Sequence, residues 1–98
     1  MESFSFKYPA TKNIIQRAHI GVVGSGDLEI LINPSEKEET EFIIRTASDG
    51  FKQTWKAVFD RFIALNDFKA VITINDFGAT PGVVSLRLAQ VIEIANQK

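Results

Sequence analysis

The sequence has no cysteine and only one histidine. The lack of cysteine excludes disulfides, thiolate metal sites and a thiol nucleophile, so any thioester chemistry must use a sulfur that a cofactor brings. One histidine cannot form a multi-histidine metal site. The formal net charge of -1 provides no basic excess to neutralise a phosphate backbone, which disfavours a nucleic-acid partner.

Long apolar runs and targeting signals are also missing. No apolar stretch approaches the roughly 20 residues that a membrane span needs. The first ten residues lack a basic region followed by an apolar one, so no signal peptide is expected. We therefore expect a cytoplasmic protein that makes no membrane contact. The length fits one domain, residues 1–98, and the 45% hydrophobic content with 8 Phe allows a small core.

Apolar periodicity predicts an α+β fold in the order β-β-β-α-β-α, with a weak extra strand at the start. The expected strands are 18–23, 28–33, 41–47 and 70–75, preceded by 3–7, and the expected helices are 51–65 and 83–96. The simplest packing is a mixed or antiparallel sheet of four or so strands with both helices on one face.

Two helical stripes are expected to enter the core. The first comprises Phe51, Trp55, Val58, Phe59, Phe62 and Leu65, and the second comprises Val84, Leu88, Val91, Ile92 and Ala95. The segment 48–50 is typical of a cap for the first helix. Thr80 followed by Pro81 is typical of a start for the second.

A hairpin is predicted around Ser25, in the stretch GVVGSGDLEIL. A three-residue loop, Gly24 to Gly26, pairs Ile20 with Ile30 and Val22 with Leu28. It gathers most apolar side chains of the two strands on one face, whereas a two-residue loop mixes the faces. Gly26 suits the left-handed residue that such loops need. Ser25 then lies at the apex with its hydroxyl in water.

Ser25 allows several interpretations. A polar turn residue is the common one. A hydrolase nucleophile is disfavoured, because the glycines do not have nucleophile-elbow spacing and His19 lies about 20 Å of extended chain away. A phosphate-binding loop is rejected for lack of the glycine spacing and lysine. An attachment site fits better, because Gly24 and Gly26 leave room for a modifying enzyme that could also contact Asp27.

The triplet at residues 76–78, Asp-Phe-Gly, matches the metal-binding motif of kinases, but 98 residues cannot form a kinase. A structural role is expected instead, with Gly78 in a turn, Phe77 packed, and Asp76 accepting bonds from backbone amides near the last helix.

Two segments together carry a resemblance: GVVGSGDLEIL at 21–31 and INDFGATPGVVSLRLAQ at 74–90. The chain resembles the acyl-carrier (delta) subunits of malonate decarboxylase and, more distantly, the acyl-carrier subunit of citrate lyase. The relatives share the Asp-x-Gly-Ala turn, and Thr80-Pro81-Gly82 after it favours the decarboxylase family.

The resemblance implies a non-catalytic carrier. Its expected α+β architecture differs from the helical bundle of ordinary acyl carriers. Its serine, here Ser25, is expected to hold 2'-(5''-phosphoribosyl)-3'-dephospho-CoA, a covalent arm ending in a pantetheine thiol. That thiol is expected to carry acetyl and malonyl thioesters during conversion of malonate to acetate and carbon dioxide. Expected partners are the transferase and decarboxylase subunits and the phosphoribosyl-dephospho-CoA transferase (the holo-carrier synthase). A citrate lyase-type carrier and a non-covalent interaction or scaffold domain remain the alternatives.

Overall fold

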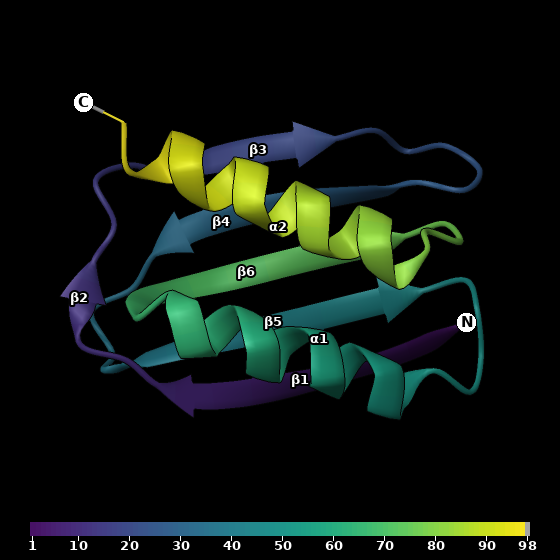
Figure 1. Ribbon diagram of the computed structural model, residues 1–98, viewed down its shortest axis with the longest axis horizontal. Helices are drawn as coiled ribbons and strands as arrows, with labels where there is room; N and C mark the ends of the chain where they lie inside the picture. Colours follow the sequence, from purple (N-terminus) through teal and green to yellow (C-terminus); the bar gives the residue numbers. More distant parts are fainter. Residues whose placement is uncertain (98) are drawn as a thin grey trace.

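The computed structural model describes residues 1–97 and shows an α+β architecture, as expected. A mixed sheet forms one layer, and the two helices cover one of its faces (Figure 1). The elements in chain order are β1 (Glu2–Pro9), β2 (Lys12–Asn13), β3 (Ala18–Gly21), β4 (Leu28–Pro34), β5 (Glu39–Thr46), α1 (Lys52–Leu65), β6 (Phe68–Asp76) and α2 (Pro81–Ala95).

The sheet has the strand order β1-β5-β6-β4-β3, and the short β2 pairs with β6 outside this path. Strands β5 and β6 run parallel and are connected through α1, whereas β1–β5, β6–β4 and β4–β3 are antiparallel. The six strands exceed the expected four or so. The increase comes from β2 and from β1, a full edge strand in which partly buried and exposed side chains alternate over eight residues.

The core lies between the sheet and the helices, and the expected apolar faces provide it. The innermost side chains include Leu28, Ile30, Ile32, Phe42, Ile44, Ile72, Ile74, Phe59, Leu88 and Val91. The predicted stripe of α2 is buried throughout. The stripe of α1 is buried only at Trp55, Val58 and Phe59, with Phe62 partly buried.

The prediction that both ends of the α1 stripe are buried was wrong. Phe51 is 51% exposed and Leu65 is 87% exposed. Phe51 precedes the first residue of the helix and Leu65 is its last residue, so both lie where the helix leaves the core. Ile63 packs against the core instead.

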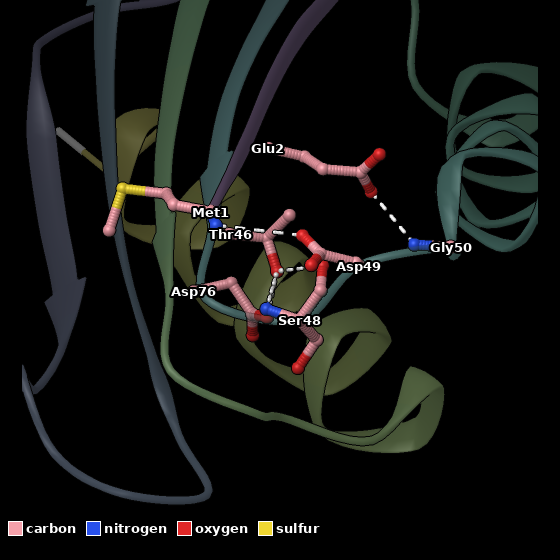
Figure 2. Close-up of polar contacts among 7 residues, drawn as sticks. All are labelled: Met1, Glu2, Thr46, Ser48, Asp49, Gly50 and Asp76. Carbon is pink, nitrogen blue, oxygen red and sulfur yellow. Dashed lines mark hydrogen bonds and ion pairs between the residues drawn. The ribbon is translucent and has the colours of Figure 1, made fainter.

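The predicted cap of α1 by residues 48–50 was also wrong, because α1 has no side-chain cap bond. These residues are held by the N-terminal segment instead (Figure 2). The amino group of Met1 lies 3.5 Å from the Asp49 carboxylate. The N–H of Gly50 donates to the Glu2 carboxylate at 2.9 Å. The segment therefore anchors β1 rather than the helix.

The start of α2 agrees with the sequence prediction. The Thr80 hydroxyl accepts a hydrogen bond from the N–H of Val83 at 3.3 Å, and Pro81 occupies the first helical position. Both features satisfy the needs of a helix N-terminus, where the first amides have no partner within the helix. These two features fix the start of α2 at Pro81, shortly after β6 ends at Asp76.

Candidate functional site

The β3–β4 hairpin has the predicted register but a longer loop. Ile20 pairs with Ile30 as expected, and the ladder ends where Gly21 pairs with Glu29. Gly21 has a φ of 89°, and a Cβ there would lie 2.1 Å from the carbonyl oxygen of Leu28. The chain turns away from the ladder at this glycine, so the predicted Val22–Leu28 pair does not form. Val22 is 58% exposed rather than on the core face.

Ser25 lies in a tight turn at the outer part of this loop and is exposed. The N–H of Asp27 donates to the carbonyl oxygen of Gly24 at 3.1 Å and closes the turn. Gly26 has a φ of 79°, the left-handed conformation predicted for it. A Cβ added to Gly26 would meet no atom within 4 Å, and one added to Gly24 would meet only a Val22 methyl at 3.8 Å. The backbone beside Ser25 is therefore open to an approaching molecule.

The loop that carries Ser25 is hydrogen-bonded to the loop between β6 and α2. The N–H of Gly26 donates to the carbonyl oxygen of Phe77 at 2.8 Å. The N–H of Phe77 donates to the carbonyl oxygen of Asp27 at 2.9 Å. Gly78 has a φ of 97°, and a Cβ there would lie 3.8 Å from the nitrogen of Gly26. The two segments on which the family resemblance rests thus form one site, a contact that the sequence alone did not predict.

Asp27 connects this site to α2. Its carboxylate accepts from Nη2 of Arg87 at 2.8 Å, from Nε of Arg87 at 3.3 Å and from the N–H of Leu28 at 2.7 Å. The hydrogen bonds from Arg87, and then the one from Leu28, hold the pKa of Asp27 below its ordinary value. Sequence reasoning missed Arg87, because its partner Asp27 lies 60 residues earlier in the chain and no local pattern pairs the two. Whether Asp27 also contacts a modifying enzyme stays a prediction.

Asp76 has the structural role expected of it (Figure 2). Its Oδ1 accepts from the N–H of Ala79 at 3.0 Å, and its Oδ2 accepts from the Thr46 hydroxyl at 2.8 Å. The side chain is buried. Oδ1 therefore stabilises the turn that follows β6, and Oδ2 connects the end of β6 to the end of β5.

His19 is engaged away from Ser25. Its Nε2 lies 3.0 Å from Oε2 of Glu29 on the neighbouring strand. Glu29 also accepts from Nδ2 of Asn75 at 3.0 Å, and the pKa of Glu29 is lowered first by that bond and then by His19. Since the sequence has no second histidine, no imidazole is available to activate Ser25.

Residues 1–97 contain no group of three or more His, Cys, Asp or Glu side chains that could hold a metal ion. Within the part of the chain that the structure describes, neither helix has the length and apolar character needed to cross a bilayer.

Comparison with known proteins gives consistent matches over nearly the whole chain. Residues 15–95 match the family model described as "Malonate decarboxylase delta subunit (MdcD)". The malonate decarboxylase acyl carrier protein of Azotobacter vinelandii is 44% identical over 94 residues, 95% of each chain. The protein of that name from Klebsiella pneumoniae is 41% identical over 96 residues, 97% of each chain.

A solved structure matches in fold as well as in sequence. A chain in the crystal structure of a Pseudomonas malonate decarboxylase hetero-tetramer in complex with malonate superposes with a TM-score of 0.92 and is 41% identical. The match covers 97% of this chain and 99% of that one. Together with the fold, these matches define the class of protein as an acyl carrier subunit. The chain belongs to the family of malonate decarboxylase delta subunits, as the resemblance in its sequence indicated.

Proposed function

We propose that this chain carries acetyl and malonyl groups as thioesters on a phosphoribosyl-dephospho-CoA arm attached to Ser25, during conversion of malonate to acetate and carbon dioxide. The observation that carries the proposal is the exposed Ser25 between two glycines, in a turn fixed to the body of the domain. The family assignment supports the carrier role and favours the decarboxylase over the citrate lyase alternative.

The residues around Ser25 fit a large covalently attached group. The serine oxygen can form a phosphate ester, and neither neighbouring residue has a side chain that would crowd it. The arm supplies a thiol, which a chain without cysteine does not have. A thiol at the end of a flexible arm reaches separate active sites at a high effective concentration.

The chain's own part in this function is to hold the attachment point still. The pair of hydrogen bonds to Phe77 and the ion pair between Asp27 and Arg87 restrain the loop from two sides. A restrained loop reduces the conformational entropy that the modifying enzyme must remove when it binds. We therefore propose that Gly24, Gly26 and Asp27 form the surface that this enzyme recognises.

The proposal includes specific partners. The hetero-tetramer named in the matching crystal structure supports association with other subunits. We infer that these are the transferase and decarboxylase subunits, and that the holo-carrier synthase is a transient partner. Location in the cytoplasm stays a sequence prediction, which fractionation of the native host would test.

Loading of Ser25 can be tested by intact mass. The purified chain is incubated with the synthase and the precursor of the arm. Three forms are compared: the parent, Ser25→Ala and Ser85→Ala, a control at an exposed serine of α2. The parent and the control should gain the mass of the arm, and Ser25→Ala should remain folded and unmodified. A loaded Ser25→Ala variant would refute the attachment site. An unmodified chain isolated with its complex from its own host would refute the carrier chemistry and leave the scaffold alternative.

A further inference from the structure

A cavity opens at the same end of the molecule as Ser25. It has a volume of about 360 Å³ and lies between the first turns of α1 and α2 and the ends of β5 and β6. Figure 1 shows the starts of both helices and the β3–β4 loop at this one end. Thr46, Ser48 and Asp76, drawn in Figure 2, lie along its wall. The volume is in the range of small-ligand pockets, about 300–1,000 Å³.

The lining combines aromatic faces with hydroxyl groups. Phe51 and Trp55 contribute rings from α1, and Val84 contributes an apolar side chain from α2. The hydroxyl-bearing residues Ser48 and Thr54 also line it. Phe51 has the helical spacing of a core residue, yet it lines the cavity and is 51% exposed. Its ring is therefore accessible to a ligand in the cavity.

Gly78 connects this cavity to the attachment site. It lines the cavity, and its missing side chain would lie 3.8 Å from the nitrogen of Gly26, the residue after Ser25. A group joined to Ser25 therefore begins close to the cavity wall. If the rest of the arm is to stay free, the part that enters the cavity must be the part nearest to Ser25.

We propose that this cavity holds the adenine ring of the arm on Ser25, an inference that rests on the proposed function. In the arm named above, the adenosine is joined to the phosphoribosyl group at the attached end, and the pantetheine lies at the far end. Adenine has apolar faces that stack on aromatic side chains and a polar edge that pairs with hydroxyls. Pantetheine is a flexible chain that would lose more conformational entropy on binding and has no ring to stack.

Holding the ring would fix where the arm leaves the domain. The arm would be bound near its root, against the starts of the two helices, while the pantetheine stays extended. This arrangement fixes the point from which the flexible pantetheine extends, without limiting the access of the thiol to partner subunits.

The test compares loaded and unloaded chain by NMR, after intact mass has established loading. Loading should shift the backbone amides of Ser48 and Ala79 and the indole of Trp55, the only tryptophan, and should leave Asn66, at the far end of α1, unchanged. Millimolar adenosine added to the unloaded chain should shift the same signals, whereas millimolar pantetheine should not. Shifts on loading that are confined to residues 22–27, or shifts of these signals by pantetheine and not by adenosine, would overturn the proposal.

Two variants separate ring binding from folding. In the unloaded chain titrated with 3'-dephospho-CoA, Phe51→Ala should weaken binding about tenfold, because it removes a stacking face. Leu86→Ala removes another exposed apolar side chain, one that does not line the cavity, and should leave the affinity unchanged. Equal affinities for both variants would refute the role of Phe51. A chain that never gains the mass of the arm would instead count against attachment at Ser25, while this titration still tests the cavity.

Discussion

Alanine at Gly21 would put a side chain where the backbone leaves no room. A Cβ at this position would lie 2.1 Å from the carbonyl oxygen of Leu28, and the φ of Gly21 is 89°. Gly26, in the same loop, has a similar φ of 79°, but a Cβ there would meet no atom within 4 Å. The two alanine variants therefore share a backbone penalty and differ in the steric clash with the backbone of Leu28 and Glu29.

The expected losses of stability follow from these two contributions. A non-glycine residue in the left-handed region costs about 1–2 kcal/mol. Overpacking against a neighbour that must move adds about 1–3 kcal/mol. We expect Gly26→Ala to lower the free energy of unfolding by about 1 kcal/mol and Gly21→Ala by about 3 kcal/mol. For a domain of this size, the second loss lowers the melting temperature by about 15 °C.

Urea denaturation of both variants, followed by far-ultraviolet circular dichroism, measures the difference directly. The comparison is valid when the urea dependence of the unfolding free energy is the same in the two variants. Equal losses at the two positions would refute the steric reasoning, because the backbone contribution alone would then account for both.

Two further predictions concern Asp27 and the cap of α2. The bonds from Arg87 lower the pKa of Asp27, so the stabilisation is complete above the ordinary carboxyl pKa of about 4 and is lost as the pH falls through the lowered value. Urea midpoints between about pH 6 and pH 2 should therefore fall less steeply in Asp27→Asn than in the parent, and identical slopes would contradict this. Thr80→Ala, which removes the bond from Val83, should lower the free energy of unfolding by about 1 kcal/mol. The control Asp49→Ala should lower it by about 0.5 kcal/mol or less. A larger loss for Asp49→Ala than for Thr80→Ala in urea denaturation would contradict the cap assignment.

The buried faces were predictable because burial follows a fixed period in each kind of element. Alternation placed Leu28 and Ile30 on the covered face, and helical spacing placed Val84 and Leu88 against them. The same rule was wrong at Phe51 and Leu65, since periodicity does not show where a helix leaves the core. The hairpin register was predictable for the same reason as the strand faces.

The rest depended on contacts between distant parts of the chain. The loop of Ser25 is longer than predicted because Gly21 turns the chain out of the ladder, and the loop then bonds to Phe77. Asp27 and Arg87 are 60 residues apart, so no local pattern pairs them. The segment 48–50 has the composition of a helix cap, but Asp49 and Gly50 contact the N-terminal residues Met1 and Glu2 instead of capping α1. Local signals thus identified the serine and its turn, and tertiary contacts decided how the turn is held.

The position of β6 has a consequence for synthesis of the protein. This strand lies between β4 and β5, yet the ribosome makes it after both. Until residues 68–76 emerge, β4 and β5 each present an unpaired edge with apolar side chains, the kind of surface that promotes aggregation of nascent chains. The central pairing of the sheet therefore forms only after residues late in the chain have emerged, and α2 follows to cover it.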